Sequence, residues 1–271
     1  MKNRKLVAIA ALGIFAAGNV LASPTPVATW NFNNTLAADE PLVSALTPID
    51  PLGLNSFITD TVFGATRQVY RFDGYQTPAD QAGLSINTTG LLNGGNAYSV
   101  DMIFQFEANQ SSWENIFGVS NRNSDNAFYV QPNNTLQIWP TGGGPTLFTF
   151  GQYHRVSLTN DGTGHVTAYL DGIFQFDLIT TSMDFSNYVV ANPNRLIHFF
   201  ADNLVGAGQG EFADGRVAMI RLFDGELTGT EVGQLPTTPG AVVPEPETLA
   251  LVLAGLGLTG FMARRRRRQA P

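Results

Sequence analysis

The segment from Tyr98 to Ala108 has the clearest pattern in the chain, an alternation of apolar and polar side chains. The apolar positions are Tyr98, Val100, Met102, Phe104 and Phe106, and the polar positions are Ser99, Asp101, Gln105 and Glu107. A period of two residues predicts a β-strand with one buried and one exposed face. We therefore expect Asp101 and Glu107 to lie on a solvated face.

Residues 154–178 repeat this pattern as three further strands, separated by turns at Asp161-Gly162 and Asp171-Gly172. Asp-Gly favours type I′ hairpins, because both central residues need a positive φ. Further expected elements are strands at 195–200 and 216–223 and a short helix within 227–235. No long stretch between the chain ends has a helical period, and 28 glycines and 15 prolines punctuate the sequence. These features predict an all-β fold, an antiparallel β-sandwich or jelly roll.

The N-terminal residues 1–22 have the pattern of a secretory signal peptide. Lys2, Arg4 and Lys5 form a basic start, an apolar stretch follows, and Val20-Leu21-Ala22 is a small-residue cleavage pattern. We expect the secretion machinery to export the chain and cleavage to follow Ala22. The alternative, an uncleaved N-terminal anchor, fits the short apolar run less well.

The C-terminus has three parts in order. A linker at 239–247 contains Pro244-Glu245-Pro246, residues 248–263 carry no charge, and 264–271 contain the arginines Arg264, Arg265, Arg266, Arg267 and Arg268. As a helix, residues 248–263 would be roughly 24 Å long, which with snorkelling arginines is enough to span a bilayer. The positive-inside rule places the arginines in the cytoplasm and residues 23–238, the expected domain, on the other side.

This C-terminal arrangement resembles the PEP-CTERM sorting signal of Gram-negative bacteria that make exopolysaccharide. The resemblance implies that an exosortase, a membrane protease-transpeptidase, recognises the segment and cleaves near Pro244-Glu245-Pro246. The helix at 248–263 would then be a temporary anchor in the inner membrane. The processed protein would go to the outer envelope, the cell surface or the extracellular matrix.

The charge of the chain limits its partners. Residues 23–246 contain seven arginines, no lysine and 21 acidic residues, a net charge of −14. Such a surface repels nucleic acid and can attract divalent cations. The chain has no cysteine, so it contains neither disulfides nor thiolate metal sites.

The order of several segments resembles the laminin-G-like, concanavalin A-like jelly rolls. The matching segments are 28–33 (ATWNFN), 98–106, 152–158 (QYHRVSL), 166–172 (VTAYLDG), 215–224 and 227–232 (LTGTEV). The resemblance implies a sandwich whose binding sites lie in its rim loops. In the family the closing strand often carries an aspartate where this chain has Ala218, so no role of that residue is carried over.

No familiar catalytic motif occurs. The E-x-D-x-x-E strand of laminarinase-type glycosidases is absent, as is G-x-S-x-G. The three histidines have no metal-ligand spacing; His154 falls in a typical hairpin position, and His198 in an apolar strand is expected to be a satisfied core residue. We therefore expect a protein that is not an enzyme.

A calcium site is one candidate, in the loop that follows the strand at 195–200. Asp202, Asn203 and Glu211 bring hard oxygen ligands to a glycine-rich loop. The alternative is an ordinary acidic loop in which Asn203 serves turn geometry.

A sugar site is the other candidate, since exposed aromatic rings stack on pyranose faces. Trp113, Tyr129, Asn134 and Trp139 are the candidate residues. The alternative is that Trp113 and Trp139 close the core at strand ends; Trp30 is expected in the core. The leading hypothesis is an exported surface or matrix protein that binds exopolysaccharide or protein. The alternatives are a polysaccharide hydrolase or lyase on the same fold and a purely structural matrix component.

Overall fold

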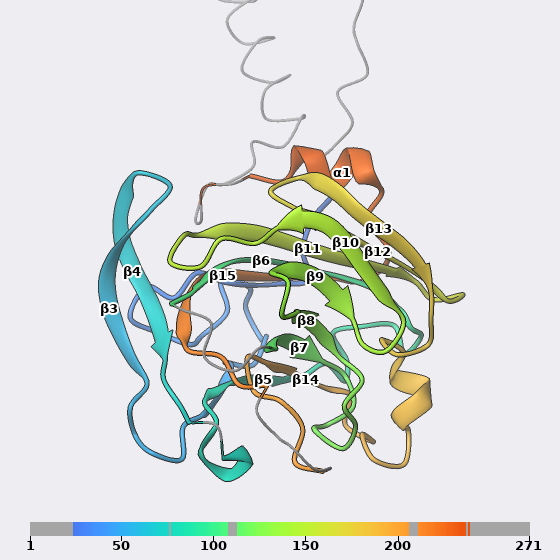
Figure 1. Cartoon of the computed structure of the whole chain (residues 1–271), viewed down its shortest axis with the longest axis horizontal. Coiled ribbons are helices and arrows are strands. Elements are labelled where there is room, and N and C mark those ends of the chain that lie inside the picture. Colours follow the sequence, from blue (N-terminus) through green and yellow to red (C-terminus); the bar gives the residue numbers. More distant parts are fainter. Residues whose placement is uncertain (1–23, 76, 108–112, 206–210, 237, 239–271) are drawn as a thin grey trace, which may run out of the picture. The chain divides into compact units, whose positions relative to one another are not determined.

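The computed structural model describes residues 24–75, 77–107, 113–205, 211–236 and 238. The described part is a sandwich of two antiparallel sheets (Figure 1). The predicted signal peptide, the Pro-Glu-Pro motif, the segment 248–263 and the arginine tail lie outside the described residues. Among the residues that are described, no helix has the length and apolar character needed to cross a membrane.

The larger sheet has eight strands in the order β13-β12-β11-β6-β15-β4-β3, with β1 also pairing with β15. Its strands are β1 (Ala28–Trp30), β3 (Ser56–Val62), β4 (Ala65–Phe72), β6 (Ala97–Phe106), β11 (His154–Asp161), β12 (His165–Leu170), β13 (Ile173–Ile179) and β15 (Gly215–Phe223). The expected strands within 154–178 and at 216–223 are confirmed, and the one expected from residue 98 is confirmed as far as Phe106. The turn between β12 and β13 has φ values of +52° at Asp171 and +79° at Gly172, as a type I′ hairpin requires.

The smaller sheet has seven strands in the order β10-β9-β8-β7-β14-β5-β2. Its strands are β2 (Thr47–Ile49), β5 (Gly83–Asn87), β7 (Glu114–Gly118), β8 (Phe128–Val130), β9 (Thr135–Ile138), β10 (Gly142–Leu147) and β14 (Leu196–Phe199). Short 3₁₀ turns lie at Pro78–Asp80 and Phe185–Tyr188. The expected strand at 195–200 is confirmed as β14.

The core lies between the two sheets and is rich in phenylalanine. Phe72 and Phe200 stack with ring centroids 3.9 Å apart, and Phe104 and Phe106 pack against the same Phe200. Trp30 is fully buried in this core, as expected. Val100 and Met102 of β6 point into this core. Because side chains alternate along a strand, Asp101 between them lies on the outer face of the larger sheet.

The helix α1 (Gly229–Gln234) lies on that outer face, away from the smaller sheet (Figure 1). It begins with a capping box, in which Thr228 and Glu231 each accept a hydrogen bond from the other's backbone N–H. Tyr169 and Phe223 pack beneath it against Val232 and Leu235. The short helix expected within 227–235 is thus confirmed.

The helix corrects the prediction that Asp101 is solvated. Asp101 lies on the expected outer face, but it is fully buried there. Its Oδ1 accepts hydrogen bonds from Arg155 Nε at 2.7 Å and Ser157 Oγ at 2.6 Å, and its Oδ2 accepts from Arg221 Nη2 at 2.7 Å. The same arginines donate to the backbone carbonyls of Val232, Leu235 and Pro236. One carboxylate and two guanidinium groups therefore fasten the C-terminal helix to the sheet. Glu107, in contrast, is half-exposed.

Candidate functional site

Three of the four predicted sugar-binding residues meet on the outer face of the smaller sheet. Trp113 directly precedes β7, Tyr129 is the middle residue of β8, and Trp139 directly follows β9. The ring of Trp113 lies edge-on to Tyr129 at 5.6 Å and to Trp139 at 5.3 Å. Tyr129 points outward because Phe128 and Val130, its neighbours along β8, point into the core.

These aromatic residues line a hollow of about 100 Å³ together with Asp125 and Glu211. Trp139 is 40% exposed, whereas Tyr129 is almost completely buried. Trp139 therefore presents an apolar surface to solvent, and Tyr129 forms part of the inner wall.

Asn134, the fourth predicted residue, lies elsewhere. It closes the turn between β8 and β9 with a left-handed backbone, φ +65°, and its N–H donates to the carbonyl of Gln131 at 2.8 Å. It is not one of the residues that line the hollow. Its position is explained by turn geometry, because Asn tolerates positive φ better than most residues.

Three carboxylates converge beside the aromatic residues. Asp125, Asp202 and Glu211 each place one oxygen within 4.8 Å of the other two. Asp125 lies between β7 and β8, and Asp202 lies three residues after β14. Glu211 is held beside β7, because its carbonyl accepts a hydrogen bond from the N–H of Asn115 at 3.2 Å.

Asn203, predicted as a metal ligand, has a different position in this group. Its amide donates to Asp202 Oδ2 at 3.0 Å and to Asp125 Oδ1 at 3.1 Å, and its side-chain oxygen accepts from the N–H of Val205 at 2.9 Å. Asn203 thus braces two carboxylates and forms a turn. Asp125 takes its place in the carboxylate group, and the polar run 121–126 (NRNSDN) before β8 is the only hint of it in the sequence.

Negative charge on the three carboxylates is unfavourable, because Asp202 is buried and the other two lie close to it. Burial, together with the nearby Glu211, raises the pKa of Asp202 to about 8. Burial and Glu211 also raise the pKa of Asp125, against a hydrogen bond from Trp139. Tyr129 donates its hydroxyl hydrogen to Asp202 Oδ1 at 2.8 Å. A proton or a divalent cation would relieve the repulsion among these three carboxylates.

The donor set fits calcium, which prefers several hard oxygen ligands. Asp125, Asp202 and Glu211 are the residues that would hold it. Asp202 Oδ1 already accepts hydrogen bonds from Tyr129 Oη at 2.8 Å and Asn115 Nδ2 at 3.3 Å, so a cation would bind through Oδ2, which accepts one from Asn203. The cation would supply positive charge that holds the loops after β7 and β14 together.

His198 lies beside this group and not in the apolar core. With Asn115, Arg122 and Asp202 it lines a cavity of about 10 Å³, room for one water molecule. Its side chain is buried, and among the described residues its Nδ1 has no hydrogen-bond partner. The prediction of a satisfied core histidine is therefore wrong. Burial, with the charge of Arg122, lowers the pKa of His198 to about 4.

This lowered pKa predicts a loss of stability in acid. The folded state favours neutral His198, so its contribution is fully present above pH ~6.5 and is lost as the pH falls towards about 4. We expect the free energy of unfolding of the wild type, relative to His198→Gln, to fall across that window. Urea unfolding at several pH values measures this difference, and the subtraction removes the other titrating groups. A difference that does not vary with pH would contradict the prediction.

The sequence matches two family models. Residues 78–233 match the concanavalin A-like lectin/glucanases superfamily, and residues 242–268 match the PEP-CTERM protein-sorting motif. This motif implies exosortase-dependent processing and export to the cell envelope or surface. The comparison with curated proteins gives no match.

Solved structures with a similar fold share little sequence with this chain. Domain 4 of AbnA, an extracellular arabinanase of Geobacillus stearothermophilus solved with arabinotriose, aligns with a TM-score of 0.54 and 16% identity, over 78% of this chain and 97% of that domain. A botulinum neurotoxin type C structure, whose cell entry is described as dependent on two ganglioside molecules, aligns with a TM-score of 0.52 and 12% identity. That match covers 78% of this chain and 50% of the toxin chain. These likenesses concern the fold alone. With the family-model match and the two-sheet sandwich, they show that the chain belongs to the concanavalin A-like lectin/glucanases superfamily and carries a PEP-CTERM sorting motif at its C-terminus.

Proposed function

We propose that this exported protein is a non-enzymatic surface or matrix component that binds carbohydrate in the hollow formed by Trp113, Tyr129 and Trp139. The observation that carries the proposal is the convergence of these rings with Asp125 and Glu211 in one hollow. Small-ligand sites combine apolar and aromatic walls with a few placed polar groups. Here an indole face would pack on the C–H face of a sugar ring, and the carboxylates would accept hydrogen bonds from its hydroxyls.

Two features of the comparisons support this class of ligand. The matched superfamily is named for lectins and glucanases, and the AbnA domain and the neurotoxin are described with a sugar or a ganglioside. The exopolysaccharide of the producing cell is the ligand that we propose. Calcium held by Asp125, Asp202 and Glu211 is proposed as an accessory, because it would fix the loops that carry the hollow.

The second candidate function is a glycosidase. Three carboxylate oxygens within 4.8 Å resemble the roughly 5–5.5 Å carboxyl separation of retaining enzymes, and Asp202 has the raised pKa of an acid catalyst. However, Asp202 is 1% exposed and does not line the hollow. A substrate in the hollow would contact Asp125 and Glu211 but not the group with the strongly raised pKa. We therefore prefer binding over hydrolysis.

Electrophoresis of the full chain, in mild detergent, through native gels that contain neutral polysaccharides tests the proposal. We expect retardation of the wild type and an affinity lower by about tenfold for Trp139→Ala, the loss typical of a central aromatic contact. Tyr75→Ala is the matched control, because Tyr75 is 61% exposed and lies outside the hollow. EGTA should reduce binding if calcium holds the loops.

Other outcomes of this experiment have definite meanings. Release of reducing ends from the polysaccharide, abolished in Glu211→Gln, would favour the glycosidase. Equal retardation of wild type and Trp139→Ala would exclude this hollow as the binding site.

The ends of the chain extend the proposal to its location. We infer that residues 1–22 are removed after Ala22, that 23–238 form the exported domain, and that 248–263 anchor it in the inner membrane until an exosortase acts. The match of residues 242–268 to the sorting motif supports the C-terminal part of this inference, and the signal-peptide pattern of residues 1–22 supports the N-terminal part.

A further inference from the structure

A second hollow lies on the larger sheet, and it shares no lining residue with the first hollow on the smaller sheet. It has a volume of about 370 Å³, within the roughly 300–1,000 Å³ of small-ligand sites. Its lining residues are Asp60, Thr61, Phe63, Gln105, Gly151, Gln152, Tyr153 and Arg216. They come from β3 and its turn, from β6, from the loop before β11 and from β15. Arg216 points outward, because Val217 beside it on β15 points into the core.

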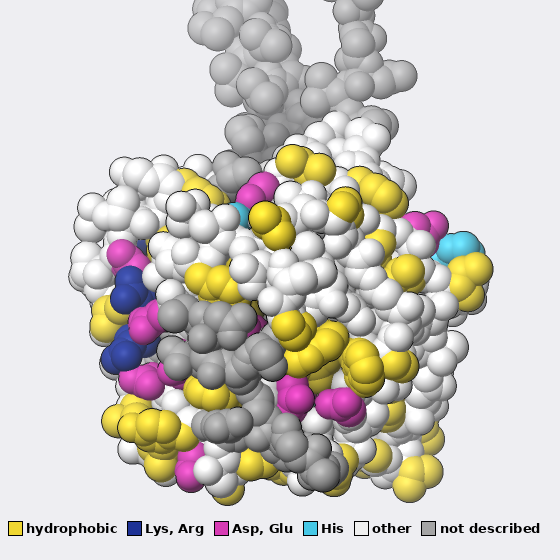
Figure 2. Space-filling model, viewed as in Figure 1, with side chains coloured by type: hydrophobic (Ala, Val, Ile, Leu, Met, Phe, Trp, Pro, Cys, Tyr) yellow, Lys and Arg dark blue, Asp and Glu magenta, His cyan; other side chains and the backbone are white. Residues whose placement is uncertain are grey.

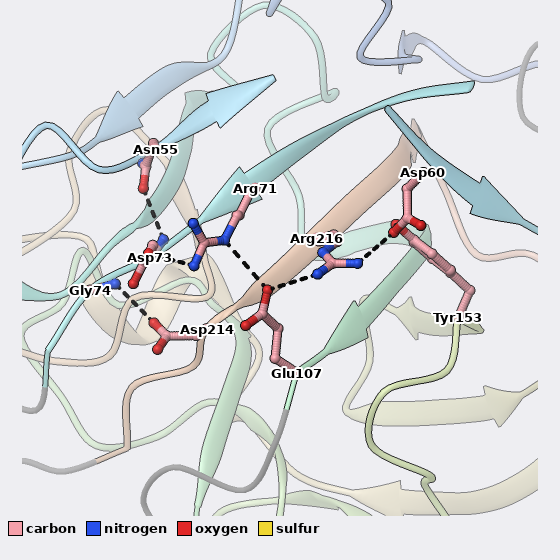
Figure 3. Close-up of polar contacts among 9 residues, drawn as sticks. All are labelled: Asn55, Asp60, Arg71, Asp73, Gly74, Glu107, Tyr153, Asp214 and Arg216. Atoms are coloured by element: carbon pink, nitrogen blue, oxygen red, sulfur yellow. Dashed lines mark hydrogen bonds and ion pairs between the residues drawn. The ribbon is translucent and has the colours of Figure 1, made fainter. Parts of the chain in front are cut away.

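The polar side chains of this hollow are held in place by a row of alternating charges (Figure 3). Asp60 Oδ2 accepts hydrogen bonds from Tyr153 Oη at 2.9 Å and from Arg216 Nη1 at 2.8 Å. Arg216 Nη2 donates to Glu107 Oε1 at 3.2 Å. The same Glu107 oxygen accepts from Arg71 Nε at 3.4 Å. Arginine and acidic side chains accordingly lie side by side on this flank of the molecule, beside β3 and β4 (Figure 2).

This row is fixed but still accessible. The side chains of Arg216 and Asp60 are 29% and 23% exposed. Burial by itself would raise the pKa of Asp60, but hydrogen bonds from Arg216, Thr61 and Tyr153 lower it, so Asp60 is ionised at neutral pH. The hollow therefore offers a charged donor, Arg216, and a charged acceptor, Asp60. Their side chains are already held in one orientation, so a ligand does not have to immobilise them.

Phe63 supplies the aromatic surface at an energetic cost to the fold. It forms the two-residue turn of the β3–β4 hairpin with Gly64, and their φ values are +47° and +83°. Type I′ turns favour Asn or Asp at this position, and a left-handed backbone is unfavourable for an ordinary L-residue such as phenylalanine. The Phe63 side chain is also 52% exposed, so burial in the fold does not offset that cost. A strained and exposed aromatic residue at the mouth of a hollow indicates a function outside the folded core.

We propose that this second hollow binds a neutral saccharide unit, so that one molecule has two carbohydrate sites on opposite faces of its sandwich. Phe63 packs on the apolar face of the sugar ring, while Asp60 and Arg216 bind adjacent hydroxyls, one as acceptor and the other as donor. Asp60 and Arg216 neutralise each other, and the chain as a whole is acidic, which selects against uronic acids. A protein with two such sites can join two polysaccharide strands.

The variant Phe63→Asn separates this proposal from a purely structural role. Asn is the preferred residue for the turn, so the variant should be at least as stable as the wild type while losing the aromatic surface. We test the full chain in mild detergent by affinity electrophoresis with dextran, arabinan, β-glucan and galactomannan, and by turbidity on mixing with the polysaccharide that binds. For Phe63→Asn we expect affinity to fall by about tenfold and turbidity to be lost. Arg216→Gln should have a similar effect, and Tyr75→Ala serves as the control.

The combination with Trp139→Ala distinguishes the two sites. If both hollows bind, each single variant retains weak binding without turbidity, and Phe63→Asn with Trp139→Ala retains none. Unchanged binding and turbidity in a stable Phe63→Asn variant would overturn the second site and leave the first. If Phe63→Asn abolished binding and turbidity and Trp139→Ala changed neither, the second site would be supported and the first rejected. No retardation by any of the four polysaccharides would overturn both.

Discussion

Replacing Asp101 with asparagine is expected to lower the free energy of unfolding by about 3–5 kcal/mol, because it leaves two buried guanidinium groups without their counter-ion. The Asp101 side chain is fully buried, and those of Arg155 and Arg221 are 4% and 7% exposed. Asparagine keeps the shape and some hydrogen bonds but removes the charge. For a domain of this size, the melting midpoint should fall by roughly 6–20 °C.

Asp177→Asn is the matched control for this variant. Asp177 lies on β13 with its side chain 49% exposed, and its ion-pair partner His165 is also exposed. Its replacement should change stability by no more than about 0.5 kcal/mol. Hydrogen exchange gives a second readout, because Arg155 binds the carbonyls of Val232 and Leu235. Protection of α1 should fall in Asp101→Asn, and a change below about 1 kcal/mol with α1 still protected would show that the helix does not depend on the buried charges.

Replacing Pro244, Glu245 and Pro246 with alanine is expected to abolish processing of the C-terminus. These residues lie inside the matched sorting motif, 242–268. The variant keeps the apolar segment and the arginines, so the precursor should accumulate in the membrane fraction at its full length. Immunoblots of membrane, envelope and medium fractions from the producing cells measure the distribution.

Pro239→Ala is the control for the processing experiment, since it removes a proline just outside the matched motif. It should be processed like the wild type. If the triple-alanine variant were also processed and released normally, the sorting assignment of Pro244-Glu245-Pro246 would be rejected.

The sequence predicts much of the sandwich because the relevant information is local. Alternation in Tyr98–Phe106 and the Asp171-Gly172 turn depend on neighbouring residues, and both are confirmed. The β3–β4 hairpin was not predicted, because Phe63 occupies a position where Asn or Asp is the usual marker. A turn that lacks its usual residues cannot be recognised from the sequence alone.

The site is less predictable because it depends on what lies beside each strand. Alternation correctly places Asp101 on the outer face, but the helix that covers it comes about 130 residues later. Likewise, Asp125 and Asp202 meet only because β7 pairs with both β8 and β14. Trp113, Tyr129 and Trp139 could be proposed from residue type, whereas the register that brings them together could not.

The pairing of β1 with β15 has a consequence for how the domain folds. Ala28, near the start of the described chain, lies opposite Leu222, near its end, and the central strand β6 also pairs with β15. The larger sheet therefore cannot close until almost the whole domain has left the ribosome. Such non-local pairings are formed slowly, because loop closure over long separations precedes any stabilising contact. The chain therefore remains unfolded until its last strand is available. An unfolded chain is the form that can pass through a narrow secretion channel.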